Sequence, residues 1–217
     1  DTEPPPLAAG EVLVRVRASS ANPYDWHFMR GEPYFMRLIV GLRGPKDSRL
    51  GADLAGVIEA VAADVTDFAV GDEVFGMADA TFAEVIAVAQ DDLAHKPADT
   101  SFVQAAAVPV AALTALQGLR NQGGIARGQR VLINGASGGV GTWAVQLARH
   151  FGAEVTAVCS GRNKQLVSGL GASRVVDYTV EDFTRGGVQY DLILDNVGNH
   201  RPADYKRCLV PSGVYVI

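Results

Sequence analysis

The chain has 217 residues, of which 48% are hydrophobic and 20% charged, with a net charge of −5. This length allows one large domain or two small ones, and the composition excludes a disordered, fibrous or peptide-like chain. The acidic balance argues against nucleic acid as a partner, and no apolar run approaches the roughly 20 residues of a membrane-spanning helix.

The opening of the chain is acidic, does not begin with Met, and lacks the basic and then apolar pattern of a signal peptide. We therefore expect a fragment of a longer protein. The two cysteines, Cys159 and Cys208, cannot build a disulfide framework or a cysteine-rich zinc lobe. A reducing compartment follows, and we expect a cytoplasmic protein.

Residues 1–103 are predicted to form a mostly antiparallel β domain, because short β-rich runs alternate with Gly and Asp turns. Asn22 as N-cap, Pro23 at the first helical position and Gly31 as terminator predict a helix over 23–30. The Gly and Pro interruptions from 33 to 49 predict a loop. The expected strands cover 11–17, 54–61, 71–74 and 82–88.

Residues 104–217 are predicted to form a second domain, in which helices alternate with short apolar strands as in βαβ units around a parallel sheet. The fold class is therefore α/β, with a doubly wound sheet that shows five of the usual six strands. The expected strands are 130–134, 154–159, 174–177, 191–195 and 214–217, and the expected helices are 138–151, 162–170 and 202–209.

The strongest chemical signal is a glycine-rich turn after the strand at 130–134, Gly135-Ala136-Ser137-Gly138-Gly139-Val140-Gly141. A dinucleotide pyrophosphate needs N–H groups at a helix N-terminus and a backbone without obstructing Cβ atoms. Gly138 and Gly139 meet this need, and Gly141 allows the helix to pack closely on the strand. A tight turn without a ligand is the alternative, but the βαβ pattern on both sides favours a nucleotide site.

The next strand indicates which nucleotide. An NAD site has an Asp or Glu at this strand end to bind the ribose 2′-hydroxyl. Here the strand ends without an acid, and Ser160, Arg162 and Lys164 offer a hydroxyl and two cations to a 2′-phosphate. NADPH is therefore the expected cofactor, the alternative being that both cations are merely solvated. The charge distribution agrees, because residues 105–217 carry 11 Lys and Arg against 7 Asp and Glu.

These features and further segments resemble the medium-chain dehydrogenase/reductases, in particular their zinc-independent NADPH quinone oxidoreductase (zeta-crystallin-like) branch. The resemblance covers nearly the whole chain and implies a GroES-like β domain followed by a Rossmann domain, with the active site in the cleft between them. It also implies a homodimeric parent protein. The segments that carry it, besides the glycine turn, are 10–16, 22–26, 51–58, 70–76, 82–84, 105–109, 170–172, 176–178 and 195–198.

Zinc-dependent relatives in this family bind the metal through a Cys and a Gly-His-Glu motif, among other ligands. At those positions this chain has Asn22 and Ala52. The resemblance therefore implies no metal, and a hydride transfer from NADPH to quinones or α,β-unsaturated carbonyls. Two alternatives stay open: an NADPH-binding sensor without turnover and, less favoured, a zinc-type alcohol dehydrogenase.

The resemblance also implies the site residues. It places Asn22 and His27 near the substrate, with Asp25 holding their helix turn. The alternatives are Asn22 as a helix cap only, and His27 and Thr114 as packing residues. The cofactor residues implied in the same way are Thr114 near the nicotinamide, Ser137, Gly138, Gly139, Val140 and Gly141 at the pyrophosphate, Ser160, Lys164 and Tyr178 at the 2′-phosphate, and Asn196 and Val197 on the next strand-end loop. Charge and reach alone add Arg162.

Overall fold

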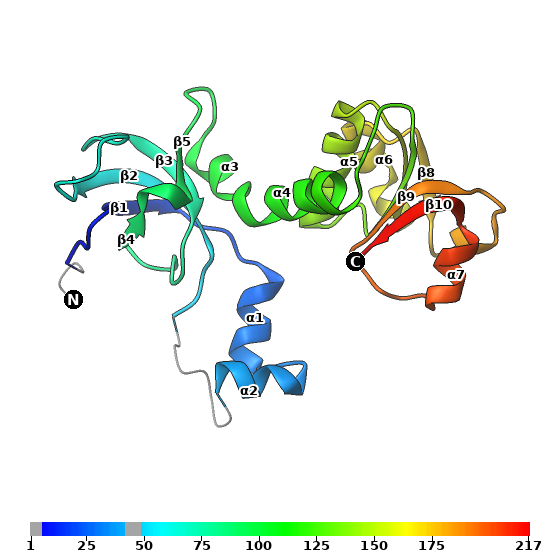
Figure 1. Cartoon of the computed structure of the whole chain (residues 1–217), viewed down its shortest axis with the longest axis horizontal. Helices are drawn as coiled ribbons and strands as arrows, with labels where there is room; N and C mark the ends of the chain where they lie inside the picture. Colours follow the sequence, from blue (N-terminus) through cyan, green and yellow to red (C-terminus); the bar gives the residue numbers. More distant parts are fainter. Residues whose placement is uncertain (1–5, 42–48) are drawn as a thin grey trace. The chain divides into compact units, whose positions relative to one another are not determined.

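The computed structural model describes residues 6–41 and 49–217. The chain folds into two compact units, Asp1–Val110 and Ala111–Ile217 (Figure 1). The expected domain boundary at 103/104 stays a prediction. In the described part of the chain no helix is long and apolar enough to cross a membrane.

Unit 1 is built on an antiparallel five-stranded sheet with the order β4-β1-β2-β3-β5. Its strands are β1 (Glu11–Ala18), β2 (Asp53–Val61), β3 (Glu73–Met77), β4 (Val85–Ala89) and β5 (Leu93–His95). Alternate residues of β1 face the core, so that Val12 and Val14 are buried together with Leu54, Ile58 and Val74. The predicted antiparallel β domain is confirmed, while β5 was not predicted from the sequence.

The predicted helix in unit 1 is confirmed as α1 (Pro23–Arg30), followed by the terminating Gly31 at φ +58°. The predicted loop over 33–49 is wrong for its first part, which forms the 3₁₀ helix η1 (Tyr34–Met36) and α2 (Arg37–Val40). Pro33 stands directly before η1, where a missing N–H costs nothing, so it introduces this segment rather than breaking it. Residues 42–48 lie outside the described part.

Two helices follow the first sheet. The first, α3 (Phe102–Ala106), is capped by Ser101, whose Oγ accepts the Gln104 N–H at 3.3 Å. The next helix, α4 (Pro109–Leu116), continues into a π-helical segment at Gln117–Gln122.

Unit 2 is built on a parallel five-stranded sheet with the order β10-β9-β6-β7-β8, which confirms the predicted α/β fold class. Its strands are β6 (Arg130–Asn134), β7 (Glu154–Cys159), β8 (Arg174–Asp177), β9 (Tyr190–Asp195) and β10 (Leu209–Val216), and its helices are α5 (Gly139–His150), α6 (Lys164–Leu170) and α7 (Pro202–Arg207). A 3₁₀ turn, η4 (Gly161–Asn163), precedes α6.

Two predicted boundaries in unit 2 are wrong. β10 begins at Leu209 rather than Val214, so the last predicted helical residue belongs to a strand. Its pairing with β9 shifts register between Leu209 and Val214. This irregularity accommodates Pro211, which has no N–H to donate and which an edge strand tolerates because one side of that strand joins no ladder. The helix predicted from 162 begins as η4 and becomes α-helical only at Lys164.

The two faces of the parallel sheet have separate cores. Val131 and Ile133 pack with α5 and α6 residues on one face, whereas Leu132 packs with Phe183 and Tyr205 on the other. Both faces of β6 are therefore buried, as in other sheets covered by helices. Because the strands are parallel, the turns after β6, β7, β8 and β9 all leave from the same edge of the sheet.

Candidate functional site

The glycine turn after β6 leads directly into α5. Gly138 is the N-cap of this helix and supplies no side chain, and the first turn of α5 contains no acidic residue. The N–H groups at a helix N-terminus attract anions, because they lack helical partners and lie at the positive end of the dipole. The turn therefore presents a backbone anion site at the carboxyl edge of the sheet.

Two glycines of the turn are needed for packing within the chain. A Cβ on Gly141 would lie 2.2 Å from the carbonyl O of Gly135. Gly135 itself has φ +75°, and a Cβ there would lie 2.8 Å from Cγ2 of Val197. The backbone clash at Gly141 cannot be relieved by side-chain rotation, and the φ of Gly135 disfavours any residue with a Cβ. Gly135 and Gly141 are therefore explained by the fold alone.

The other two glycines are not explained in this way. A Cβ on Gly138 would meet only the carbonyl O of Gly135, at 3.4 Å, and one on Gly139 only the Cβ of Ala111, at 3.9 Å. Packing in the described part of the chain thus leaves room for a side chain at either position. Their lack of side chains instead suits a ligand that approaches the backbone closely, as a pyrophosphate does.

The turns after β6 and β7 are joined by a residue that sequence reasoning missed. Asn163 donates from Nδ2 to Ser137 Oγ at 2.9 Å and to Ser160 Oγ at 3.4 Å. Two of the predicted cofactor residues are thereby brought together, although neither is close to the other in sequence. The charge pattern drew attention to Arg162 and Lys164 and away from the neutral Asn163 between them.

The turn after β8 completes this group. Tyr178 lies beside the end of β7, because its N–H donates to the Cys159 carbonyl at 3.2 Å, and its side chain is exposed. Lys164 Nζ lies 3.8 Å from Asp177 Oδ2. β7 itself ends without an acid, but Asp177, the last residue of β8, brings a carboxylate to this place. Arg162 is exposed on η4.

The turn after β9 lies against the glycine turn. Asn196 donates from its N–H at 3.2 Å and from Nδ2 at 3.1 Å to the carbonyl of Asn134, the last residue of β6. A Cβ on Gly135 would contact Val197 Cγ2, which shows how close the two turns are. The predicted residues Asn196 and Val197 are thus adjacent to the predicted pyrophosphate residues.

A buried carboxylate holds this β9 turn in place. Asp195 Oδ1 accepts the N–H groups of Val197 and Gly198, each at 3.0 Å, and Oδ2 accepts the Tyr215 hydroxyl at 2.9 Å. Burial opposes ionisation of Asp195, but the hydrogen bonds from Gly198, Val197 and Tyr215 hold its pKa below the ordinary value. Burial and Asp195 raise the pKa of Tyr215 to about 12, so this hydroxyl remains a donor.

Thr114 is exposed on α4. It lies three residues after Ala111, and residues three apart share one face of a helix. Since Ala111 is the nearest residue to the Gly139 Cβ position, that face is directed toward the start of α5. Contact of Thr114 with a nicotinamide stays a prediction.

In unit 1, Asn22 and Asp25 lie together at the start of α1. Asp25 is 6% exposed, and its carboxylate accepts the Asn22 N–H at 2.7 Å and the Gly51 N–H at 2.8 Å. These two bonds fix the helix start to the segment that leads into β2. Asp25 therefore holds the helix turn, and whether Asn22 contacts a substrate stays a prediction.

A second buried carboxylate, Asp53, was missed in the sequence. It is 1% exposed, and its Oδ2 accepts Asn22 Nδ2 at 2.8 Å as well as the Ser20 hydroxyl. Its Oδ1 accepts the Val110 N–H at 2.7 Å, at the beginning of α4. The Asn22 side chain is thus held by Asp53. A carboxylate at the first residue of an apolar strand is the only sequence signal for this role.

His27 is separated from these groups. Its Nδ1 lies 2.7 Å from the Glu32 carbonyl O, and its ring stacks on Trp26 with the centroids 3.8 Å apart. Because a carbonyl oxygen only accepts, Nδ1 carries the proton in this bond. Neutral His27 then has an acceptor at Nε2 and no second N–H to donate.

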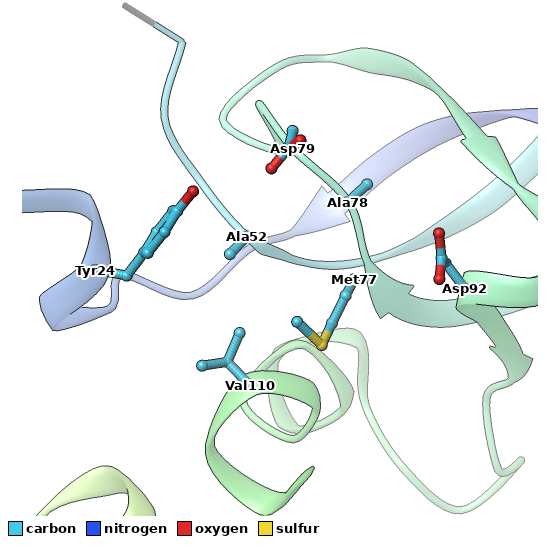
Figure 2. Close-up of a pocket in the computed structure, with 7 residues that line it drawn as sticks. All are labelled: Tyr24, Ala52, Met77, Ala78, Asp79, Asp92 and Val110. Atoms are coloured by element: carbon cyan, nitrogen blue, oxygen red, sulfur yellow. The ribbon is translucent and has the colours of Figure 1, made fainter. Parts of the chain in front are cut away.

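Unit 1 contains a cavity of about 440 Å³ near the start of α1 (Figure 2). The described residues that line it include no Lys or Arg, and they are Tyr24, Ala52, Met77, Ala78, Asp79, Asp92 and Val110. Asn22, Asp25 and His27 are not among them. Sequence reasoning missed Tyr24. Burial, followed by the charges of Asp79 and Asp25, raises the pKa of its phenol, so Tyr24 remains a hydrogen-bond donor at neutral pH.

A catalytic zinc does not fit these residues. Ala52 contributes a methyl group to the cavity wall, and the amide of Asn22 is engaged by Asp53. Within 6–41 and 49–217, no three His, Cys, Asp or Glu side chains are grouped so that they could hold a metal ion.

Two protein families match this chain. The family described as "Alcohol dehydrogenase GroES-like domain" matches residues 8–169, and the one described as "Zinc-binding dehydrogenase" matches residues 139–217. Asn22 and Ala52, where the zinc-dependent relatives have metal ligands, lie within the first match and outside the second.

Individual relatives agree with this assignment. The chain is 38% identical over 208 residues to mouse (Mus musculus) "NAD(P)H oxidoreductase RTN4IP1, mitochondrial", covering 87% of this chain and 52% of that protein. It is 34% identical to "Trans-enoyl reductase pgmF" of Aspergillus terreus, covering 88% and 56% of the two chains. The chain thus spans little more than half the length of these curated relatives.

A solved structure shows the same fold. The quinone oxidoreductase from Coxiella burnetii superposes with a TM-score of 0.86 at 32% identity, covering 99% of this chain and 68% of that one. The matched domains, the glycine turn and the order of the two sheets lead to one assignment: the chain belongs to the medium-chain dehydrogenase/reductase superfamily.

Proposed function

We propose that this chain is part of an NADPH-dependent, metal-free oxidoreductase that transfers hydride to quinones or α,β-unsaturated carbonyls. The observation that carries the proposal is the pair Gly138 and Gly139, which leave an open backbone at the start of α5 although packing does not require it. Relatives named as an NAD(P)H oxidoreductase, a quinone oxidoreductase and a trans-enoyl reductase support it.

The residues of unit 2 would hold the cofactor. The N–H groups at the start of α5 would bind the pyrophosphate, and Ser160, Arg162 and Lys164 would bind the 2′-phosphate. The Asn196–Val197 turn, fixed by Asp195, would border the nicotinamide half. When bound, NADPH would supply the hydride, and the protein contributes position and electrostatics.

The cavity of unit 1 favours a neutral acceptor. Its wall includes the carboxylates of Asp79 and Asp92, and no cation among the described lining residues offsets them. An anionic acceptor would therefore be repelled, whereas quinones and enones carry no charge. The protonated Tyr24 phenol can donate a hydrogen bond to an acceptor oxygen on which negative charge develops. We propose Tyr24 in this donor role, while Asn22, whose Nδ2 is held by Asp53, keeps its proposed place near the substrate.

The assay is NADPH oxidation, followed by the loss of the nicotinamide absorbance. The acceptors are p-benzoquinone, trans-hexenal and, as the anionic comparison, crotonate. We expect turnover of at least one neutral acceptor and little of crotonate. Tyr24→Phe keeps the ring but removes the hydroxyl, and should lower kcat/KM about tenfold or more without changing the Kd for NADPH.

The sensor alternative gives a different result in the same experiment. NADPH that binds tightly, as measured by calorimetry, without oxidation by either neutral acceptor would contradict the proposed reductase and favour a sensor. Gly139→Val is the control for nucleotide binding, since its branched side chain would occupy the open backbone, and it should lose both binding and turnover.

A further inference from the structure

We infer that Asp177 is the positioning residue that sets cofactor selectivity. Its carboxylate fixes the turn that carries the 2′-phosphate residues, and its charge partly offsets Lys164, so that it limits the preference for a 2′-phosphate. This inference rests on the proposed function, because it concerns the same nucleotide site. No role of its own was predicted for Asp177 from the sequence, although it belongs to the segment 176–178 that carries the resemblance, and it lies on the strand beyond the one that normally carries the selecting acid.

The first part of this role is structural. Asp177 is 8% exposed and ends β8, and its Oδ1 accepts the Thr179 N–H at 3.0 Å and the Thr179 hydroxyl at 2.7 Å. The backbone of Gly161 lies close to this carboxylate. A Cβ on Gly161 would lie 2.3 Å from Oδ2, so the turn after β7 reaches this carboxylate only because residue 161 is glycine. The contact fixes the turn with or without a nucleotide.

The second part is electrostatic. Lys164 Nζ lies 3.8 Å from Oδ2, beyond hydrogen-bond distance, and its side chain is 49% exposed. Such a pair is weak, so the ammonium can turn to an incoming phosphate at little cost. Hydrogen bonds from Thr179, above all from its hydroxyl, hold the pKa of Asp177 below its ordinary value, so the carboxylate is charged at neutral pH.

The two parts affect nucleotides differently. A 2′-phosphate near Arg162 and Lys164 meets two positive charges and the negative charge of Asp177. A nucleotide without this phosphate has no negative group at the same place for Asp177 to repel. The hydrogen bonds of Asp177 therefore support both nucleotides, whereas its charge opposes only NADPH.

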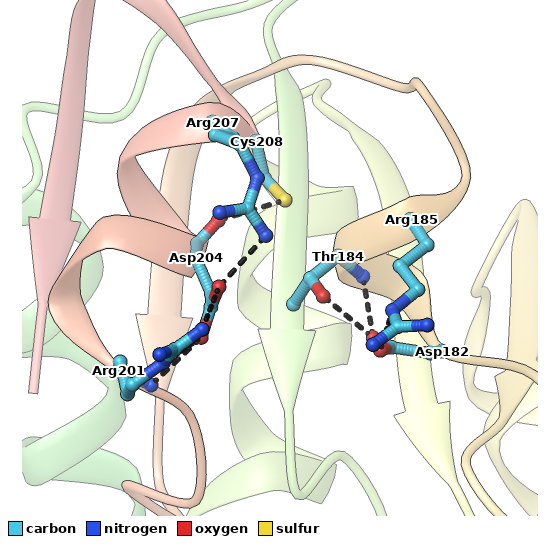
Figure 3. A network of polar contacts seen from close by, with 7 residues as sticks. All are labelled: Asp182, Thr184, Arg185, Arg201, Asp204, Arg207 and Cys208. Carbon is cyan, nitrogen blue, oxygen red and sulfur yellow. Dashed lines mark hydrogen bonds and ion pairs between the residues drawn. The ribbon is translucent and has the colours of Figure 1, made fainter.

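The chain supplies a matched control at Asp182, in the connection between β8 and β9. Asp182 Oδ1 accepts the Thr184 N–H at 2.9 Å and the Thr184 hydroxyl at 2.7 Å, which repeats the Asp177–Thr179 arrangement (Figure 3). Its ion-pair partner is Arg185, at 3.2 Å, rather than a residue of the proposed nucleotide site. Neutralising Asp182 thus removes an equivalent charge and weakens equivalent hydrogen bonds outside the proposed nucleotide site.

The test compares Kd values for NADPH and NADH, measured by calorimetry at one salt concentration. The proteins are the wild type, Asp177→Asn, Asp177→Ser and Asp182→Asn, each checked for folding by circular dichroism. Two neutral variants at 177 are used because one of them can fail to fold. We expect the ratio of the NADH Kd to the NADPH Kd to rise about three- to tenfold in both, the size of one screened charge pair. Asp182→Asn should leave the ratio within a factor of about 2.

Other outcomes overturn the inference. If both nucleotides weaken equally in the variants at 177, Asp177 only supports the fold, and if the ratio falls, it assists phosphate binding instead. In either case wild-type binding of NADPH would leave the proposed function intact. A wild type that binds neither nucleotide would contradict both proposals.

Discussion

The starts of helices α1 and α5 satisfy their N–H groups in opposite ways. At α1, the Asp25 carboxylate accepts the Asn22 N–H, and at the start of α4 Asp53 accepts the N–H of Val110, the last residue of unit 1. At α5, Gly138 supplies no side chain and the first turn has no acid. Every helix start needs acceptors for its free N–H groups. The starts of α1 and α4 receive them from carboxylates of unit 1, whereas the start of α5 leaves them for an external anion.

This difference accounts for the charge distribution along the sequence. In unit 1, Asp25 and Asp53 accept hydrogen bonds within the unit, and Asp79 and Asp92 line its cavity. In unit 2 the carboxylates of Asp177 and Asp195 hold the turns after β8 and β9. Backbone N–H groups and cations therefore remain available to the proposed nucleotide. An excess of acids in one half and of bases in the other thus reflects two kinds of site in one chain.

The internal acceptors of unit 1 can be tested by removing the carboxylate of Asp53. Asp53→Ala leaves the Val110 N–H and the Asn22 amide without their buried acceptor, and we expect a loss of about 4 kcal/mol in the free energy of unfolding. The matched control is Asp64→Ala, because Asp64 accepts the Gly10 N–H at 3.0 Å on the surface. That variant should lose less than about 1 kcal/mol. Urea denaturation measures both, and equal losses would contradict the buried role of Asp53.

The open backbone at the start of α5 can be tested with two glycines of the same turn. Gly141→Ala places a Cβ 2.2 Å from the Gly135 carbonyl O and should cost about 3 kcal/mol of stability. Gly139→Ala meets no atom closer than 3.9 Å, so its stability should change by less than about 1 kcal/mol. Its NADPH affinity should nevertheless fall at least about tenfold, because the Cβ enters the ligand's approach. Unchanged affinity in Gly139→Ala would show that the open backbone holds no nucleotide.

The two cations that we propose to bind the 2′-phosphate can be removed together. Arg162→Ala with Lys164→Ala should weaken NADPH by about 2 kcal/mol, roughly 30-fold, since both side chains are exposed and each contact is partly screened. NADH should weaken less than about threefold, because it lacks the 2′-phosphate. Arg174→Ala is the control, as Arg174 pairs with Glu181 at 2.7 Å on β8 and should affect neither nucleotide. Calorimetry that finds the same loss for both nucleotides would refute the assignment of NADPH.

The sequence predicted the open start of α5 better than the buried carboxylates that accept hydrogen bonds within the chain. The glycine turn and the βαβ periodicity are local signals, so β6 and α5 could be placed within a residue. Asp53 and Asp177 could not be assigned, because burial depends on distant segments: Asp53 meets Val110, and Asp177 meets Gly161. For the same reason, the sequence did not predict that Nδ1 of His27, which was expected near the substrate, bonds the carbonyl O of Glu32. The cytoplasmic location and a homodimeric parent stay predictions.

Charge can also stabilise unit 2 directly, at Asp204 on α7. Arg201 Nε lies 3.1 Å and Arg207 Nη2 2.7 Å from its carboxylate oxygens (Figure 3). Hydrogen bonds from Arg201 and then Arg207 lower the pKa of Asp204 from 3.8 to about 2. Because the folded-state pKa is the lower one, this stabilisation is present above the unfolded pKa and is lost as pH falls through the folded value.

The comparison of wild type with Asp204→Asn isolates this smallest effect. The difference in their free energy of unfolding should stay constant from about pH 5 to pH 7 and shrink as the pH falls from about 4 to about 2. Arg207→Met removes one of the two guanidinium partners, so it should move this loss toward higher pH. Urea denaturation across this range measures both shifts. A difference that does not depend on pH would mean that Asp204 contributes through the shape of the α7 start and not through its charge.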